Sequence, residues 1–202
     1  SPSRVTGKVI RGISKLINRH TEPGRLVIVN TDGWVDGGEA VEYKAQMLKE
    51  VQPDITLGIG DTTHISRIVE TARKAALLVG APDTIKERTH VDRRELRALG
   101  YRRCLANASI RLFRLADITL RDSISLEPLS PNRLPLSRVQ GLKDAVVGLL
   151  SADDYLQEVG VLRELIPSTE TAKILCRGRF TPAKIEVGAV RLDNEAREVT
   201  YA

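Results

Sequence analysis

Residues 26–38 read Leu26-Val27-Ile28-Val29-Asn30-Thr31-Asp32-Gly33-Trp34-Val35-Asp36-Gly37-Gly38. The opening part is a continuous aliphatic run, of the kind that is buried on both faces of a parallel sheet. The part that follows is polar and rich in glycine, which predicts a loop at the carboxyl end of that strand. We therefore expect residues 26–29 to form the first core strand of an α/β layer.

The segments on either side of this stretch alternate between helical and strand patterns. Apolar residues recur at helical spacing over 4–20 and 39–51, and short aliphatic runs follow at 55–59 and 76–79, with a further helix expected between them. This alternation predicts helices packed on a parallel sheet. Because such sheets bind ligands at the carboxyl ends of their strands, residues 31–38 are the first candidate for a functional site.

The pattern changes after Phe113. Before it, residues 86–108 have the composition of a strongly basic helix, and beyond it short apolar runs are separated by Pro, Gly, Asn and Asp. Runs at these spacings predict a small antiparallel sheet or barrel. We place a domain boundary near Leu115, which gives a first domain of residues 1–115 and a β-rich C-terminal domain of residues 116–202. The expected strands are 145–150, 160–165, 173–176 and 185–192.

Composition limits the class of protein. With 42% hydrophobic and 28% charged residues in a chain of 202, the protein is globular rather than disordered. A formal net charge of +5 and a sequence pI near 9.4 favour anionic partners. The two cysteines, Cys104 and Cys176, lie far apart in no C-x-x-C pair, so neither a zinc site nor a disulfide framework is indicated. A reducing cytoplasm is the expected location.

The chain shows no sign of a membrane partner. No apolar run is long enough to span a bilayer, and no signal-peptide core follows Ser1. The first residue is not methionine, which suits a processed, trimmed or excised segment. We expect a soluble chain without a targeting segment in the residues given.

Trp34 is the only tryptophan, and it lies among glycines and aspartates. One interpretation is a ring folded back over the edge of the sheet, because Trp is commonly well buried. The other is a platform on which a nucleic-acid base stacks. Gly33 would let a ligand backbone come close, and Thr31 can donate or accept a hydrogen bond. Asp32 and Asp36 would repel phosphate unless a cation or nearby arginines offset them.

Arginine dominates residues 86–103, which hold seven Lys or Arg and three acidic residues. A solvated helix face is one interpretation of such a charge run. The bias towards arginine favours phosphate contact, because the guanidinium fork binds two phosphate oxygens at once. Arg93 and Arg97 share a helix face, and Arg88 is expected on the preceding loop or the first turn.

Other chemical motifs are weak. The turn Gly58-Ile59-Gly60-Asp61 lacks the third glycine of a dinucleotide fingerprint, so we interpret it as the end of a strand. Pairs such as Asp61 with His64, or His90 with Asp92, lack a third ligand, and no metal site is assigned to them. No G-x-S-x-G nucleophile elbow occurs.

Taken together, these features resemble the polynucleotide 5'-hydroxyl kinase family. That family includes the kinase of the eukaryotic pre-mRNA cleavage complex, the pre-ribosomal RNA processing kinases and their archaeal relatives, and the chain resembles the archaeal type. The resemblance covers nearly the whole chain. It consists of Ser1-Pro2, an aliphatic strand that runs into Thr-x-Gly-Trp at residues 31–34, Arg-x-x-x-x-Arg at Arg88 and Arg93, and a β-rich C-terminal domain.

The resemblance implies a fold and a set of roles. The fold would be part of a P-loop NTPase-like parallel sheet with helices, followed by the small β-rich domain. Thr31, Gly33 and Trp34 would hold the 5'-hydroxyl end of an RNA or DNA substrate, with Trp34 packed on a base. The same family acts in RNA processing, so an RNA-processing complex is an expected partner.

The arginines would act on the nucleotide. By resemblance, Arg88 and Arg93 form a catalytic lid that closes over the phosphates of ATP or GTP and stabilises the transferred γ-phosphoryl group, with Mg²⁺ bridging the phosphates. Arg97 and Arg102 are less specific candidates for phosphate contact. Their position in the basic helix is the basis of this prediction.

The chain departs from the family in one respect. It contains no G-x-x-x-x-G-K-[ST] loop, and Gly7-Lys8-Val9 lacks both the upstream glycine and the hydroxyl residue. We expect these residues alone to be inactive as a kinase, and the full-length parent to carry the loop before Ser1. An alternative is a non-catalytic RNA-binding or scaffold protein, and a third is a GTPase-like nucleotide-binding domain that binds no RNA.

Overall fold

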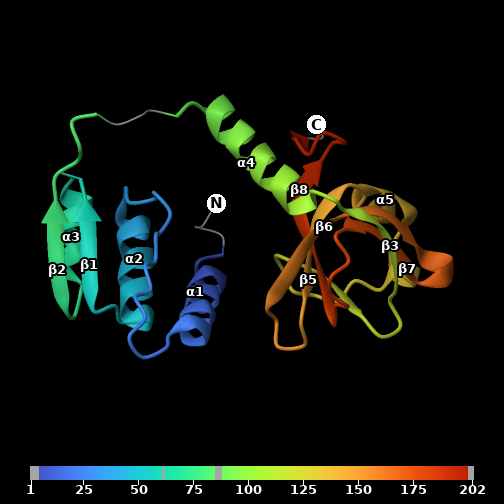
Figure 1. Ribbon diagram of the computed structural model, residues 1–202, viewed down its shortest axis with the longest axis horizontal. Coiled ribbons are helices and arrows are strands. Elements are labelled where there is room, and N and C mark those ends of the chain that lie inside the picture. The colour runs from blue at the N-terminus through green and yellow to red at the C-terminus, as the bar shows by residue number, and fades with distance from the viewer. Residues whose placement is uncertain (1–4, 61, 85–87, 200–202) are drawn as a thin grey trace. The chain divides into compact units, whose positions relative to one another are not determined.

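The structure, a computed structural model, describes residues 5–60, 62–84 and 88–199. It divides into two compact units, Ser1–Lys86 and Glu87–Ala202 (Figure 1). The first unit is α/β with a parallel sheet, and the second is mainly an antiparallel sheet, which confirms the predicted fold class. Ser1-Pro2, one of the features of the resemblance, lies outside the described residues.

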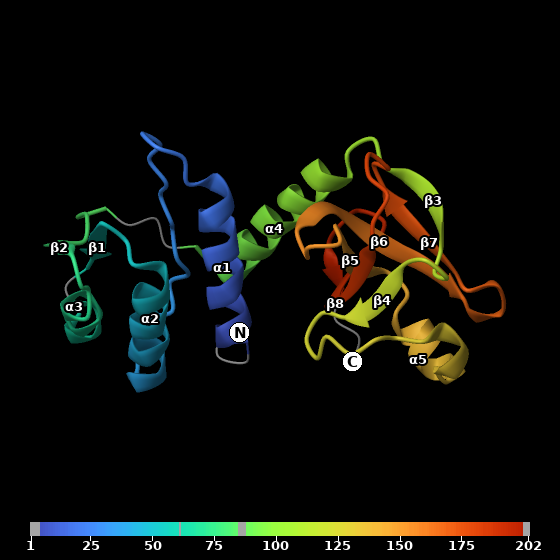
Figure 2. The same ribbon diagram turned by 90° about the horizontal axis from the view of Figure 1, so that it is seen from below.

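The first unit alternates helices and strands. Its strands β1 and β2 pair in parallel with Ile55 opposite Ala75, and α3 connects them (Figure 2). The helices and the two later strands predicted for this part of the chain are therefore confirmed. The elements are α1 (Thr6–His20), α2 (Gly38–Val51), β1 (Ile55–Ile59), α3 (Thr63–Glu70) and β2 (Ala75–Val79).

Close packing explains a glycine in β1. A Cβ atom on Gly58 would lie 2.5 Å from Cγ2 of Val69 and 2.9 Å from Cγ2 of Ile65, both on α3. Only glycine lets the helix approach the strand this closely. The side chains of Leu57 and Ile59 alternate with Gly58 and are exposed, so α3 covers one face of the two strands.

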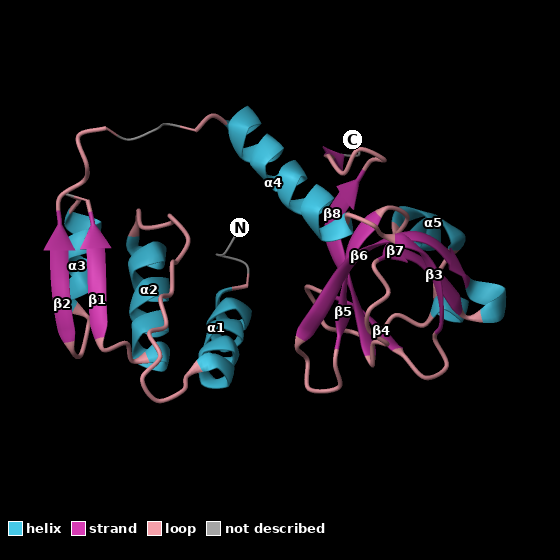
Figure 3. Ribbon diagram, in the orientation of Figure 1, coloured by secondary structure: helices cyan, strands magenta, loops and turns pink. Residues whose placement is uncertain are grey.

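The strand expected at residues 26–29 does not form. This segment has no regular secondary structure and pairs with no strand in the described part of the chain (Figure 3). Leu26 is 84% exposed and Ile28 is 81% exposed. The prediction of a core strand here is wrong, because an aliphatic run indicates a tendency towards burial but a strand also needs a neighbour for its backbone hydrogen bonds.

The second unit begins with α4 and continues as a seven-stranded sheet in the order β3-β7-β6-β5-β8-β4, with β9 paired to β8. All pairings are antiparallel except that of β4 with β8. The elements are α4 (His90–Leu105), β3 (Ser109–Arg114), β4 (Thr119–Asp122), η2 (Pro131–Arg133), α5 (Leu136–Gly141), β5 (Ala145–Leu150), β6 (Leu156–Ile166), η3 (Pro167–Thr169), β7 (Thr171–Cys176), β8 (Lys184–Leu192) and β9 (Glu198–Val199).

Alternating side chains build the core of this unit. Every second residue of β5 and β7 is buried, and Leu149, Leu162, Ile174 and Ile185 are among the largest side chains that are fully enclosed. Each of the four strands predicted for this region corresponds to an observed strand. The sequence analysis did not predict β3, β4 or β9.

Helix α4 belongs to the same compact unit as the C-terminal strands. The helix contacts β6, and β3, which follows it, pairs with β7. The boundary between the two compact units therefore follows Lys86. The domain boundary inferred from composition, near Leu115, stays a prediction. The helix also starts later than the basic run, because Thr89 caps it.

Candidate functional site

The Thr31–Trp34 loop precedes α2 and folds onto it. Thr31 and Gly33 are exposed, and Trp34 is half-buried. The Trp34 ring stacks on Tyr43 of α2, with ring centroids 5.7 Å apart and an interplanar angle of 26°. It also packs against a small cluster that α1 and α2 form around Ile10. The ring thus folds back onto helices rather than over a sheet edge, and it keeps part of its surface open.

Asp32 anchors this loop. Its carboxylate accepts hydrogen bonds from the main-chain N–H of Trp34 at 3.1 Å, the Tyr43 hydroxyl at 2.9 Å and Nζ of Lys44 at 3.1 Å. Partial burial alone would raise the pKa of Asp32, but the hydrogen bonds from Lys44 and Tyr43 outweigh it and lower that pKa below 3.8. Asp32 is therefore a firmly ionised group in the folded loop.

The charge of Asp32 is offset locally. Lys44 is only 4% exposed, and its Nζ also donates to the backbone carbonyl of Asp32 at 2.8 Å. The carboxylate of Asp36, in contrast, is largely exposed and lies 3.7 Å from Nδ1 of His64. The cation that the sequence analysis required beside Asp32 is present, and it removes the expected repulsion of phosphate at that position.

A capping box fixes the start of α4. The Thr89 hydroxyl accepts from the N–H of Asp92 at 3.1 Å, and the Asp92 carboxylate accepts from the N–H of Thr89 at 2.8 Å. Arg88 is then the residue before the cap, and Arg93 is the fourth residue of the helix. The five-residue spacing therefore places both residues at the amino end of α4.

Both arginines of this pair are exposed. Arg93 makes no side-chain hydrogen bond or ion pair with the residues that the structure describes, and Arg88 acts electrostatically on Asp92. The amino end of a helix carries a partial positive charge. Two guanidinium groups at such an end suit the oxygens of a phosphate.

Arg97 and Arg102 have partners within their own unit. The Arg97 guanidinium binds both carboxylate oxygens of Glu198, at 2.6 and 2.8 Å, and Arg102 donates to the carbonyl of Glu195 at 2.9 Å. Arg94 also donates to the backbone carbonyl of Glu198. These contacts give the two arginines a structural role, and their contact with phosphate stays a prediction.

The two groups of predicted site residues belong to different units. Thr31, Gly33 and Trp34 lie in the first, and Arg88 and Arg93 in the second. Each group is well defined by itself. Their convergence on a single cleft, which the sequence analysis implies, remains a prediction.

Sequence reasoning missed the residues that support the loop. Tyr43 falls within the helix expected at residues 39–51 but was not singled out, and Lys44 was not considered. Both are buried, at 3% and 4% exposure. The available signal was a lysine next to a core position of an amphipathic helix, with an aspartate in the preceding loop to pair with it.

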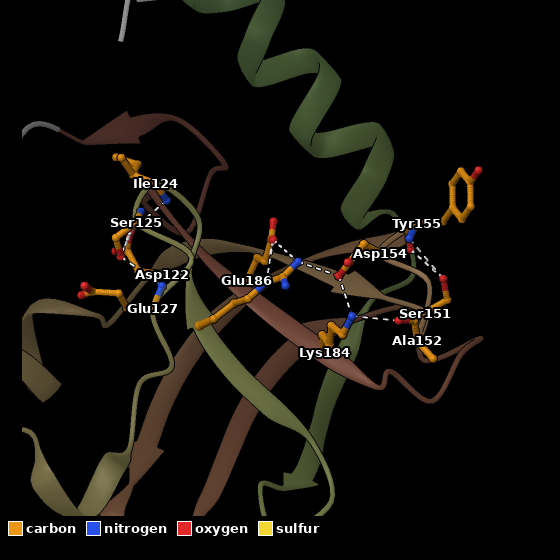
Figure 4. Close-up of polar contacts among 11 residues, drawn as sticks. Asp122, Ile124, Ser125, Glu127, Ser151, Ala152, Asp154, Tyr155, Lys184 and Glu186 are labelled. Atoms are coloured by element: carbon orange, nitrogen blue, oxygen red, sulfur yellow. Dashed lines mark hydrogen bonds and ion pairs between the residues drawn. The ribbon is translucent and has the colours of Figure 1, made fainter. Parts of the chain in front are cut away.

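A second polar network lies in the β-rich unit (Figure 4). Arg121 of β4 pairs with Glu186 of β8 and with Asp154, and Lys184 also contacts Asp154 at 2.7 Å. The two positive and two negative groups balance, and they join strands to the turn before β6. Beside them, Asp122 accepts from two N–H groups of the following turn. This network serves the stability of the sheet.

Other kinds of site find no support in the described residues. In residues 5–60, 62–84 and 88–199, no group of three or more His, Cys, Asp or Glu side chains could hold a metal ion. Within the same ranges, no helix is both long and apolar enough to cross a membrane.

The residues present fit a nucleotide only in part. Arg88 and Arg93 are suitable donors to phosphate oxygens. However, the 202 residues contain no G-x-x-x-x-G-K-[ST] loop, whose backbone N–H groups would cradle those phosphates. These residues alone therefore do not make a complete site for ATP and Mg²⁺.

Comparison with known proteins agrees with the observed fold. Residues 1–107 match the family described as "mRNA cleavage and polyadenylation factor CLP1 P-loop", and the chain belongs to that family. Two similar proteins are polyribonucleotide 5'-hydroxyl-kinases of archaea, which confirms the resemblance to polynucleotide kinases.

These relatives are distant and longer. The protein from Pyrococcus horikoshii is 26% identical over 118 residues, which are 58% of this chain and 32% of the relative. The protein from Pyrococcus abyssi is 24% identical over 118 residues, which are 58% of this chain and 33% of the relative. The chain thus spans about a third of the length of the curated relatives it matches.

Solved structures show the same fold. A structure of the interface between Pcf11p and Clp1p aligns with a TM-score of 0.68 at 13% identity, over 91% of this chain and 51% of that one. The wild-type Clp1p–Pcf11p complex aligns with a TM-score of 0.63, at the same identity and coverage. At this identity the likeness concerns the fold alone.

Proposed function

We propose that this chain is the substrate-holding and lid part of a polynucleotide 5'-hydroxyl kinase that acts in RNA processing. The observation that carries the proposal is the Thr31–Trp34 loop. In a member of a P-loop family, its single tryptophan is anchored on Tyr43 and left partly open to solvent. An aromatic ring held in this way suits a nucleic-acid base, which stacks without sequence preference.

Each group has a distinct task in this proposal. Trp34 stacks on a base near the 5'-hydroxyl end, while the exposed Thr31 and Gly33 contact its backbone. Arg88 and Arg93 bind phosphate oxygens and stabilise charge on the group in transfer. ATP or GTP, bound with Mg²⁺, would supply the γ-phosphoryl group.

The phosphate loop would lie elsewhere in the parent protein. The family is described as a P-loop family, and the match covers only about a third of the length of each curated relative. We therefore propose that the complete parent is active and that these 202 residues alone transfer no phosphate. A cytoplasmic location is part of the same proposal, and the free thiols of Cys104 and Cys176 suit a reducing compartment.

Phosphate transfer by the complete parent protein tests the proposal. The assay follows the γ-phosphate of ATP onto a 5'-hydroxyl oligoribonucleotide. We expect Arg88→Ala to lower kcat, and Trp34→Ala to raise KM about tenfold or more, since stacking on an aromatic ring contributes about 1–3 kcal/mol. Arg73→Ala, an exposed arginine outside these groups, is the matched control. A parent without transfer, or one that tolerates both substitutions, would contradict the proposal.

A scaffold role is the second candidate. The absence of a phosphate loop from these residues favours it, and similar solved structures contain Clp1p bound to Pcf11p. On this hypothesis the protein binds an RNA end within an RNA-processing complex and performs no chemistry. It predicts that the complete parent binds the oligoribonucleotide through Trp34 but transfers no phosphate to it.

A further inference from the structure

We propose that Asp32, the central acidic residue of Thr31-Asp32-Gly33-Trp34, is a positioning residue that sets the plane of the Trp34 ring for a single base. The proposal rests on the proposed function of the loop. It goes further by assigning a role to a residue whose charge alone argues against contact with nucleic acid.

Asp32 first restrains the backbone of the loop. The carboxylate of Asp32 accepts the N–H of Trp34, two residues further on, in the manner of an Asx turn. This bond fixes the direction in which the Trp34 side chain leaves the loop. Without it, the exposed residues Thr31 and Gly33 would leave that direction free.

Tyr43 contacts both Asp32 and Trp34. Its hydroxyl donates to Asp32 at 2.9 Å, and its ring stacks on Trp34. One side chain of α2 therefore holds both the carboxylate and the indole. Because Asp32 and Trp34 are also joined through the backbone, the three residues close a triangle in which the ring plane cannot turn without breaking a contact.

Lys44 balances the charge of Asp32. A lysine that is almost fully buried requires partners for its charge. Nζ of Lys44 donates to both the carboxylate and the carbonyl of Asp32, and it lies 5.1 Å from the centre of the Tyr43 ring. The lysine neutralises Asp32, so a phosphate of the ligand meets no net negative charge at this residue.

The stacking of Tyr43 on Trp34 also limits which ligand can bind. One face of the Trp34 ring is taken by Tyr43, so at most one base can stack on the indole, and the ring cannot be inserted between two bases. Such a platform suits the last base at a strand end. It is less suited to the interior of a continuous stack of bases.

The test uses the 202-residue chain and the fluorescence of its only tryptophan. Asp32→Asn removes the charge at constant size, and Asp36→Asn makes the same change in the same loop as the control. Without ligand, we expect Asp32→Asn to increase acrylamide quenching of Trp34, and the control to leave it unchanged. Circular dichroism checks that the helices persist.

The second arm measures affinity for a labelled 5'-hydroxyl oligoribonucleotide by anisotropy. We expect Asp32→Asn to weaken binding about fivefold to tenfold, which is part of the loss caused by Trp34→Ala. In the Trp34→Ala background, Asp32→Asn should have no further effect, because Asp32 acts through the indole. An equal loss in both backgrounds would overturn the proposal, as would unchanged quenching and affinity.

Tyr43→Phe keeps the stacked ring and removes one hydrogen bond to Asp32. It tests the positioning role of Asp32 if Asp32→Asn does not fold. We expect more quenching of Trp34 and an affinity lowered about threefold, and the absence of both changes would overturn the positioning role. The proposed stacking of a base on Trp34 is tested separately. If Trp34→Ala binds the oligoribonucleotide normally, the stacking function is wrong even where quenching shows that Asp32 orients the ring.

Discussion

The guanidinium group of Arg97 holds both carboxylate oxygens of Glu198, 101 positions later in the chain. This pair fastens the middle of α4 to β9. Of the arginines nearer the start of the helix, Arg93 makes no such bond to a carboxylate among the described residues, and Arg88 acts electrostatically on Asp92 of the capping box. The basic run therefore divides into a structural part and a part that we expect to contact ligands.

This division predicts different effects on stability. We expect Arg97→Ala to speed hydrogen exchange of the α4 amides and lower the melting temperature, because it leaves Glu198 without its partner. Arg93→Ala should change neither by more than the experimental error. Equal effects of the two substitutions would contradict the assignment of Arg97 to structure and Arg93 to ligand contact.

The loop around Trp34 should respond to pH at two limits. Hydrogen bonds lower the pKa of Asp32 below 3.8, so its contribution to stability is complete above that value and is lost as the pH falls through the lower, folded pKa. Burial, and then Asp32, raise the pKa of Tyr43 from 10.0 to about 12. The contribution of Tyr43 is therefore complete below 10.0 and is lost as the pH rises towards 12.

Trp34 emission recorded against pH checks this behaviour. We expect it to stay constant between the two limits and to change beyond each. Tyr43→Phe removes the ionisable hydroxyl, so the alkaline change in emission should disappear in that variant. An alkaline change of the same size in Tyr43→Phe would show that the transition arises elsewhere.

Gly58 provides a test of the packing in the first unit. Gly58→Ala places a methyl group within 2.5 Å of Val69 and 2.9 Å of Ile65. Overpacking of this kind costs about 1–3 kcal/mol. We expect a matching loss in the free energy of unfolding by urea. Gly12→Ala, in α1 where the added carbon meets nothing within 4 Å beyond the helix's own nearby backbone, should not destabilise the protein.

Periodicity alone predicted much of this fold. The helices and the later strands follow from local patterns, because side-chain spacing decides which face can be buried. Residues 26–29 show the limit of periodicity. Their apolar character can be read locally, but whether they form a strand depends on a second strand to pair with. β3 was missed because its exposed edge carries arginines, so that Ser109–Arg114 resembles a continuation of the basic helix.

The candidate site divides in the same way. Trp34 and the spacing of Arg88 and Arg93 could be recognised from the sequence, since each motif is contiguous. The partners of Arg97 and Arg102 lie about a hundred positions away, at Glu198 and Glu195, and no local pattern connects them. Such contacts become visible only when the chain is folded.

Titration of the chain with a 5'-hydroxyl oligoribonucleotide, with Trp34 emission as the signal, tests the stacking function most directly. A base that stacks on the open side of the indole should quench the emission in a saturable way, with the same midpoint as the anisotropy of a labelled oligoribonucleotide. Binding seen by anisotropy while Trp34 emission stays constant, or no binding at all, would contradict the claim that this ring holds the end of a polynucleotide.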